Sequence, residues 1–330
     1  MRICLRRRDF ITLVVGAAAW PLAARAQLQK MRRIGVLMGR NAEDSEEQAR
    51  LTAILQGLQE RGWTDGRNVR IDIRWSAGDP DRGRRYAAEL VALSPNVIIA
   101  DTSTPLAALL QATQTVPIVF AGVIDPSAGF VASLARPGGN ATGFTSFDYG
   151  TSAKWLELLK EIAPGLTQVA VLRDPTIAAG IGQMAAIQAV APALGVELSP
   201  LGVRDADEIE RGVTTFARGS KRGLIVTAGP AVATHRDLLV ELAARLGLPT
   251  IYPFRFYMIG GGLISYGPET IEPYRQAVSY VDRILKGEKP ADLPAQAPTK
   301  YELVINLKTA KALGLDIPPT VYARATEVIE

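Results

Sequence analysis

Residues 34–38, IGVLM, form a continuous apolar run that is typical of a strand buried on both faces of a parallel sheet. The residues that follow predict a helix, because leucine and isoleucine recur at intervals of three and four between Leu51 and Leu58, and Gly62 ends the pattern. Further strands are expected at residues 69–75, 97–100 and 116–120. This alternation of strands and helices predicts a parallel, doubly wound sheet with right-handed crossovers.

The same order of elements starts again in the second half of the chain. Strands are expected at residues 169–172, 196–201, 224–226 and 249–252, with helices between them. Residues 227–230, TAGP, follow the third of these strands, just as residues 101–104, DTST, follow the third strand of the first half. The repeated order predicts an α/β fold of two doubly wound parallel-sheet lobes joined by a hinge.

The predicted lobes share the C-terminal part of the chain. We expect the first lobe at residues 27–142 with part of 263–290, and the second at residues 143–262 with part of 291–330. A chain that starts in one lobe, builds a second and ends in short elements should cross between them more than once. Candidate crossings are residues 138–147, 253–267 and 287–300. Several crossings form a hinge, and a hinge between two lobes creates a cleft.

Loops at the carboxyl ends of the predicted strands carry the candidate site residues, because ligands of open parallel sheets bind there. Helices that begin at these loops offer N–H groups to a carboxylate, an acidic side chain can hold an ammonium group, and aromatic rings can stack on a ligand. The alternative is that these residues are helix caps, turns or core. The candidates are Arg40, Asp101, Thr102, Ser103, Thr104, Asp125, Thr145, Phe147, Asp174, Thr227, Ala228, Tyr252, Phe256 and Tyr266.

Signatures of catalysis are missing from the sequence. The first predicted strand is not followed by G-x-G-x-x-G, and neither a G-x-x-x-x-G-K-[ST] nor a G-x-S-x-G motif occurs. The single histidine, His235, falls in a predicted helix, and the single cysteine is Cys4. We therefore expect a binding protein without catalytic residues, cofactor or metal site, although an enzyme that uses only carboxylates stays an alternative.

The first 26 residues, MRICLRRRDFITLVVGAAAWPLAARA, have the pattern of an export signal that is cleaved after Ala26. Three arginines precede a short apolar segment, residues 11–20, and small residues flank the cleavage point. Residues 7–11, RRDFI, also match a twin-arginine signal, and an ordinary secretory signal with adjacent arginines is the alternative. The mature protein is expected in the periplasm.

The net charge of the chain comes from this segment. Five of the 37 basic residues and one of the 33 acidic residues lie within residues 1–26, so the remaining chain carries equal numbers of both. The sequence therefore gives no support to binding of nucleic acid or of an anionic membrane surface.

Seven segments together resemble one family. They are RRRDFITLVVGAAAWPLAARAQ (6–27), MRRIGVLMG (31–39), GLQERGWTDGRNVRIDIRW (57–75), VPIVFAGVIDP (116–126), SLARPGGNATGF (133–144), KWLELLKEIAP (154–164) and PTKYELVINLKTAKALGLDIPP (298–319). In this order and spacing they resemble the substrate-binding proteins of ABC transporters of the TrpX-like type, which have a class I periplasmic-binding-protein fold.

The resemblance implies a two-lobed receptor that closes over a small solute and docks on a membrane permease, and some relatives take aromatic amino acids. It implies pocket residues where the loops match by position: residues 101–104, Asp125, Thr145, Thr227 and Tyr252. The expected ligand is an aromatic amino acid or an aromatic carboxylate, and a monomer is expected because both lobes must face one transporter. A periplasmic sensor for a signalling partner and a secreted α/β enzyme acting on a small solute stay open.

Overall fold

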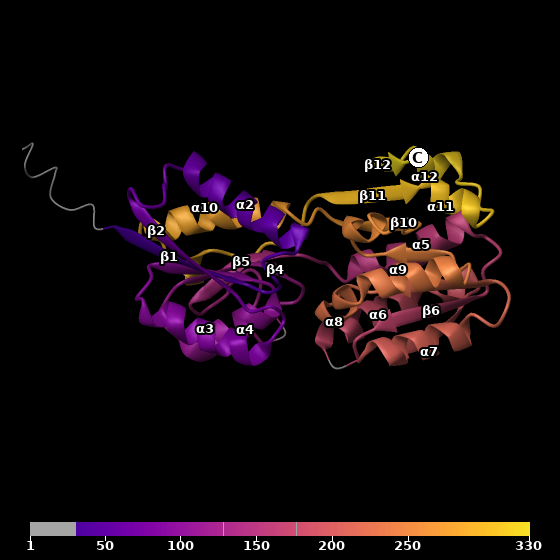
Figure 1. Cartoon of the computed structure of the whole chain (residues 1–330), viewed down its shortest axis with the longest axis horizontal. Helices are drawn as coiled ribbons and strands as arrows, with labels where there is room; N and C mark the ends of the chain where they lie inside the picture. The colour runs from indigo at the N-terminus through magenta and orange to yellow at the C-terminus, as the bar shows by residue number, and fades with distance from the viewer. Residues whose placement is uncertain (1–30, 128, 176) are drawn as a thin grey trace, which may run out of the picture.

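Two α/β lobes lie side by side, each built around its own sheet (Figure 1). The computed structural model describes residues 31–127, 129–175 and 177–330. The predicted export signal, residues 1–26, lies outside the described residues. Within them, no helix is both long enough and apolar enough to cross a lipid bilayer.

The sheet of the first lobe has five parallel strands in the order β2-β1-β3-β4-β5. Strand β1, which lies between β2 and β3, is the apolar run predicted from the sequence, and residues 34–38 are buried. The alternating strand β2 forms one edge and stays partly exposed. The bounds are β1 (Arg32–Met38), β2 (Val69–Trp75), β3 (Val97–Asp101), β4 (Ile118–Val123) and β5 (Ala141–Thr145).

Helices cover both faces of this sheet. Helices α2 (Ser45–Glu60) and α10 (Glu272–Leu285) pack on one face, where they share a core with Ile34, Val36 and Met38 of β1. Helices α3 (Pro80–Ala92) and α4 (Ser103–Ala112) lie on the other face, which receives Leu37. Successive side chains of a strand point to opposite faces, so the continuous apolar run of β1 supplies both cores.

The sheet of the second lobe repeats this strand order and extends it. Its strands lie in the order β7-β6-β8-β9-β10-β11-β12, and all neighbours are parallel except β10 and β11. The first five therefore repeat the order of lobe one, as the sequence predicted. The bounds are β6 (Gln168–Arg173), β7 (Glu197–Gly202), β8 (Arg222–Val226), β9 (Thr250–Tyr252), β10 (Ile264–Pro268), β11 (Tyr301–Asn306) and β12 (Glu327–Ile329).

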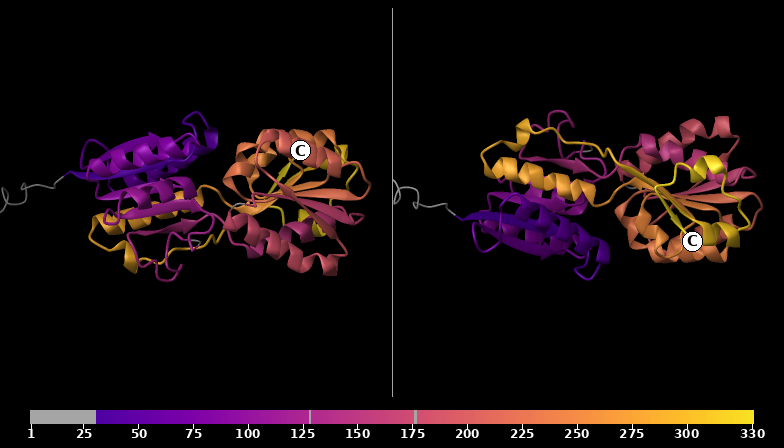
Figure 2. Two further views of the ribbon diagram at one scale, coloured as in Figure 1. Left: turned by 90° about the horizontal axis from the view of Figure 1, so that it is seen from below. Right: turned by 90° about the horizontal axis from the view of Figure 1, so that it is seen from above.

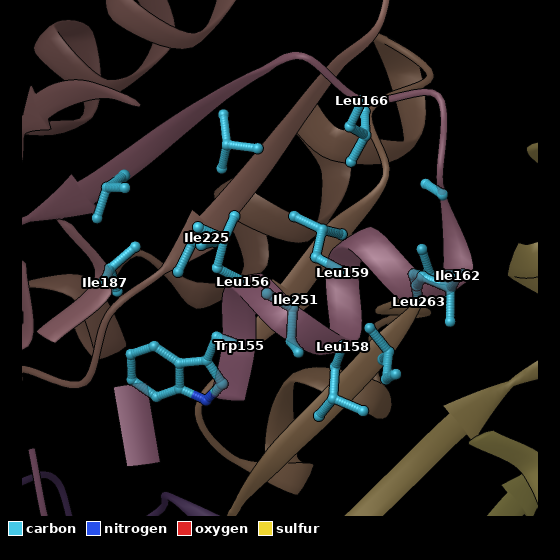
Figure 3. Packing of buried hydrophobic residues seen from close by; sticks show 14 of the residues in the cluster. Trp155, Leu156, Leu158, Leu159, Ile162, Leu166, Ile187, Ile225, Ile251 and Leu263 are labelled. Carbon is cyan, nitrogen blue, oxygen red and sulfur yellow. The ribbon is translucent and has the colours of Figure 1, made fainter. Parts of the chain in front are cut away.

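The second lobe has two hydrophobic cores, and one of them is built around α5. Leu156 and Leu159 of this helix lie beside Ile225 and Ile251 of the sheet, and the indole of Trp155 is buried in the same cluster (Figure 3). The indole N–H of Trp155 donates to the carbonyl of Tyr266 over 2.7 Å, so this large side chain has its polar atom paired. The helices of this lobe are α5 (Gly150–Ile162), α6 (Ala178–Val190), α7 (Ala206–Phe216), α8 (Pro230–Thr234), α9 (Arg236–Arg245), α11 (Leu307–Ala312) and α12 (Pro319–Tyr322).

The chain passes between the lobes at residues 146–149, 269–271 and 297–300 (Figure 2). The second passage lies after the predicted segment 253–267, because β10 pairs with β9 and β11 inside the second sheet. Strand β5 continues to Thr145, beyond the predicted boundary at 142, because its last residues pair with β4. Gln296 also stays with lobe one, where its N–H donates to the carbonyl of Gly143 over 2.9 Å.

Gly143 is the tightest point of the first sheet. Its φ of +155° is in a region that glycine favours, and a Cβ there would overlap the carbonyl oxygen of Phe120 on the neighbouring strand. Gly143→Ala should therefore lower the free energy of unfolding by about 3 kcal/mol, through backbone strain and overlap in a packed sheet. Equilibrium urea unfolding measures this difference.

Gly139→Ala is the matched control, because Gly139 is exposed and a Cβ there meets no described atom within 4 Å. We expect this control to unfold at nearly the wild-type urea concentration. Equal unfolding midpoints for the two variants would contradict the close approach of β5 to β4.

Candidate functional site

A cavity of about 290 Å³ lies between the two lobes. Its walls are loops and helix starts at the carboxyl ends of strands from both sheets, together with the second passage between the lobes and α10. The lining residues are Gly39, Arg40, Arg50, Gly78, Thr102, Ser103, Thr104, Gly122, Ile124, Ser146, Gly229, Pro230, Ala231, Ala233, Thr234, Phe254, Phe256, Pro268, Glu269, Thr270 and Tyr274. A ligand in this cavity would contact both lobes at once.

The first turn of α4 forms a polar part of the wall. The helix starts at Ser103, and Pro105 has no N–H, so the free N–H groups of the first turn belong to Ser103 and Thr104. Thr102 precedes them with a φ of 65° and a ψ of −179°, a conformation that costs a non-glycine residue about 1–3 kcal/mol. The N–H of Thr102 donates to the carbonyl of Ala121 over 2.9 Å, and this bond holds the strained turn against β4. The result is a fixed group of donors suited to a carboxylate.

Asp101 lies beneath this turn and is fully buried. One carboxylate oxygen accepts from the N–H of Gly39 over 2.8 Å. The other accepts from the hydroxyl of Tyr274 and lies 3.5 Å from the guanidinium of Arg50. Burial raises the pKa of the Tyr274 hydroxyl well above its usual value, so this hydroxyl stays a donor. Asp101 thus connects the end of β3 to the loop after β1, to α2 and to α10.

Glu47 of α2 joins two arginines that line the cavity. Its Oε1 accepts from Arg50 over 2.6 Å and from Arg40 over 3.1 Å. Within the part of the chain that the structure describes, its buried Oε2 has no hydrogen-bond partner. Burial, and next the Asp101 carboxylate, raise the pKa of Glu47 to about 8, although both arginines oppose the shift.

The second lobe contributes an aromatic wall that also meets lobe one. Phe256 stacks on Phe254 with ring centres 5.4 Å apart. The guanidinium carbons of Arg40 from lobe one and Arg236 from lobe two lie 5.9 Å and 5.8 Å from the Phe256 ring centre. Asp44, the residue that caps α2, lies 3.3 Å from Arg236, so an ion pair spans the two lobes. Burial alone would raise the pKa of Asp44, but Arg40 and Arg236 hold it below its usual value.

The structure brings part of the predicted set together at the cavity. Arg40, Thr102, Ser103, Thr104 and Phe256 line it, and Asp101 lies directly behind the wall. Their assignment as ligand contacts stays a prediction. The remaining candidates lie elsewhere in the described structure, and each has local interactions or packing that account for its position.

Most of the other candidates make hydrogen bonds within loops or pack against aromatic rings in the core. The Asp125 carboxylate accepts from the Tyr149 hydroxyl over 2.6 Å, Thr145 donates its N–H to Gln296, and Asp174 follows β6. Thr227 donates its hydroxyl to the carbonyl of Leu172 over 2.8 Å, and Ala228 exchanges two hydrogen bonds with Gln183. Three aromatic candidates pack against other rings of lobe two: Phe147 on Trp155, Tyr252 on Tyr257, and Tyr266 on Tyr301.

Sequence reasoning missed several lining residues, among them residues of α2, of α10 and of the passage that leads into α10. Arg50 was overlooked although Glu47 and Arg50 fall on the buried side of α2, with Leu51 and Ile54. Charged residues on the apolar side of a helix were the signal that could have identified it. Glu269, Thr270 and Tyr274 follow β10 and gave no such signal, because only the return of the chain to lobe one brings them to the cavity.

The arrangement of the cavity is suited to binding a small organic ligand. In residues 31–127, 129–175 and 177–330, no group of three or more His, Cys, Asp or Glu side chains could hold a metal ion. The cavity instead combines hydroxyls and helix N–H groups on one side with stacked phenylalanines on the other. Such a small number of placed polar groups in a largely apolar cavity is typical of sites for small organic ligands.

The raised pKa of Glu47 predicts how stability depends on pH. At a pH between the ordinary value of 4.5 and about 8, the folded protein keeps a proton that the unfolded chain has lost. The free energy of unfolding should therefore fall as the pH rises through this interval. Glu47→Gln keeps the neutral shape and removes the titration, so it should reduce this fall by about 2 kcal/mol in urea unfolding.

Glu60→Gln serves as the control, because Glu60 is an exposed residue at the end of the same helix. This variant should keep the wild-type dependence on pH. A Glu47→Gln protein with an unchanged dependence would show that Glu47 titrates normally.

Comparisons with known proteins agree with this geometry. The family model for ABC transporter substrate binding proteins matches residues 41–329. The chain is 25% identical to a tyrosine-binding protein of Clostridioides difficile strain R20291 over 262 residues, which cover 79% of this chain and 75% of that protein. A crystal structure of a conserved domain protein from Vibrio cholerae O1 biovar El Tor has a TM-score of 0.83 and 27% identity, with 91% of this chain and 100% of that chain covered.

A second crystal structure, the ABC domain from Streptococcus pneumoniae in complex with L-Trp, also has a TM-score of 0.83, with 26% identity and 90% and 99% of the two chains covered. These matches span both lobes and the shared tail. They confirm the family and the class I periplasmic-binding-protein fold predicted from the sequence. Proteins of this family bind solutes outside the cytoplasm and are not enzymes. This chain therefore belongs to the family of ABC transporter substrate-binding proteins.

Proposed function

We propose that this chain is the exported, monomeric receptor of an ABC importer. It binds an aromatic amino acid or an aromatic carboxylate between its lobes and delivers it to a permease in the inner membrane. The observation that carries the proposal is the interlobe cavity, in which lobe one presents polar donors and lobe two presents stacked phenylalanines. The predicted signal with the twin-arginine pattern at residues 1–26 supports location in the periplasm.

The chemistry of the two walls supports an aromatic ligand with an acidic end. Ser103 and Thr104 offer hydroxyls and N–H groups that suit a carboxylate. Phe254 and Phe256 offer ring faces on the opposite lobe, where an aromatic group gains both apolar burial and stacking. The tyrosine-binding relative and the structure with L-Trp are named for aromatic amino acids, which supports the same class of ligand here.

Closure follows from contacts that both lobes make with the ligand and with each other. A solute that touches both walls stabilises the closed form relative to the open form, because it gains contacts only when the lobes meet. The ion pair between Asp44 and Arg236 adds to this preference without a ligand. A permease can then distinguish the closed form by the relative position of the lobe surfaces.

Binding to the mature chain, residues 27–330, tests the proposal directly. We expect aromatic amino acids or aromatic carboxylates to raise the melting temperature, whereas sugars and nucleosides should not. A ligand at about 100 times its Kd adds about 2.7 kcal/mol to the stability. Phe256→Leu should weaken the bound aromatic compound about fivefold in calorimetry, because the ring contact is lost while most of the volume stays.

Phe216→Leu is the matched control, since Phe216 is a buried phenylalanine of α7 that does not line the cavity. It should leave the affinity unchanged. A panel without any aromatic binder would refute the proposed ligand class, and chemical conversion of a bound compound would favour an enzyme.

The ion pair between the lobes predicts a second effect. Arg236→Gln removes the partner of Asp44 and should shift the ligand-free protein toward the open form. A partly exposed pair is worth about 0.5–1 kcal/mol, so the apparent affinity should fall about two- to fivefold. Small-angle X-ray scattering of the ligand-free protein should show a larger radius of gyration.

Arg245→Gln is the control from the same helix, because Arg245 pairs with Glu210 within lobe two at 2.8 Å. It should change neither the radius of gyration nor the affinity. If Arg236→Gln behaves like this control, the interlobe pair does not contribute to closure.

A further inference from the structure

The acidic residues around the cavity distinguish between the two ligand classes. An α-amino acid brings an ammonium group as well as a carboxylate, and an ammonium group that is removed from water needs a carboxylate or several carbonyls around it. A simple carboxylate has no such requirement. The question is therefore which acids the cavity can offer, and whether their oxygens are already used.

Two of the acids that the sequence suggested for this role are already bonded. Both oxygens of Asp101 accept hydrogen bonds, one from the N–H of Gly39 and one from the hydroxyl of Tyr274. Asp101 is also fully buried behind the wall, so a ligand would have to break these bonds to reach it. Asp125 accepts from the hydroxyl of Tyr149 and does not line the cavity.

Among the described residues, Glu269 is the one acid that lines the cavity. Its carboxylate accepts from the guanidinium of Arg275 over 3.0 Å. Arg275 lies 3.6 Å from Glu272 as well, so this edge of the cavity already contains a paired set of charges. A ligand ammonium at Glu269 would compete with Arg275 and repel it.

The arginines of the cavity wall are suited to a ligand carboxylate. Arg40 and Arg50 line the cavity, and they share one oxygen of Glu47. The side chain of Arg50 is only 9% exposed, and within the described residues its Nε has no hydrogen-bond partner. The first turn of α4 adds the N–H groups and hydroxyls of Ser103 and Thr104. The backbone N–H groups and the guanidinium groups of this wall can only donate hydrogen bonds, whereas only the two hydroxyls can also accept them, so the wall favours a ligand carboxylate over an ammonium group.

We propose that the ligand is an aromatic monocarboxylate without an α-ammonium group. Its carboxylate lies against the first turn of α4 on the side of Arg50, and its ring lies between the lobes against Phe254 and Phe256. The inference rests on the proposed function, because it selects one of the two ligand classes proposed for the same cavity. It also separates this chain from the relatives that are named for tyrosine and L-Trp, with which it shares about a quarter of its residues.

Matched pairs of compounds test this selection on the mature chain. Each pair shares a ring and differs in the amino group: 3-phenylpropionate with phenylalanine, 4-hydroxyphenylpropionate with tyrosine, and indole-3-propionate with tryptophan. We expect at least one acid to bind about tenfold or more tightly than its amino acid in calorimetry, and we expect 2-phenylethylamine, which lacks the carboxylate, not to bind. Tighter binding of the amino acid in every pair would overturn the inference and leave the proposed function intact. No binding by any member would refute both.

Two variants test the acid and the helix start of the cavity wall one at a time. Glu269→Gln should strengthen binding of the preferred acid about two- to fivefold, because it removes a negative charge from the wall of the cavity that receives the ligand carboxylate. Ser103→Ala should weaken the same acid about three- to tenfold, because it removes a hydroxyl donor while the helix start remains. A large loss in Glu269→Gln together with no loss in Ser103→Ala would show that the ligand is held by its ammonium group, and the inference would fail.

Discussion

The buried carboxylate of Asp101 is the interaction on which the arrangement of the site depends. A carboxylate that is fully removed from water is unfavourable unless its oxygens are bonded, and here three other parts of the fold supply its partners. Gly39 comes from the loop after β1, Arg50 from α2 and Tyr274 from α10, while Asp101 itself ends β3. Because α10 enters lobe one only after the chain has built most of lobe two, the bond to Tyr274 also fixes where that passage ends. The floor of the cavity and one part of the hinge therefore depend on the same carboxylate.

Close backbone packing completes the same region. Thr102 keeps a backbone conformation that glycine favours, and its N–H bond to Ala121 holds it there. Gly122 has a φ of +73°, and a Cβ at this position would overlap the Tyr274 hydroxyl. Strain of this kind persists only where the surroundings determine the conformation. The helix start that faces the cavity is consequently preorganised, so a ligand does not have to order it on binding.

The polar groups and the aromatic rings of the cavity wall come from different lobes. Lobe one provides the helix N–H groups, the hydroxyls and the arginines, whereas Phe254 and Phe256 of lobe two provide ring faces. A ligand with one charged end and one aromatic end is satisfied only when both walls are in place. The contacts of such a ligand with both walls stabilise the closed form relative to the open form, and a permease can distinguish the two forms. The pair of Asp44 and Arg236 joins the two lobes outside the cavity lining, so it forms without a ligand.

The sequence by itself determined the fold class, the internal repeat and the edge of the sheets where the cavity lies. The apolar run of β1 and the repeated order of strands required two doubly wound sheets, and parallel strands place their carboxyl ends together. Local patterns also identified Arg40, the start of α4 and Phe256. Only the tertiary structure decided that Asp101 is bonded behind the wall, that Tyr252 belongs to a core, and that Glu269 and Tyr274 reach the cavity. The physical reason is that a strand-end position is local, whereas the direction of a side chain and its hydrogen-bond partners depend on segments more than a hundred residues away, such as α10.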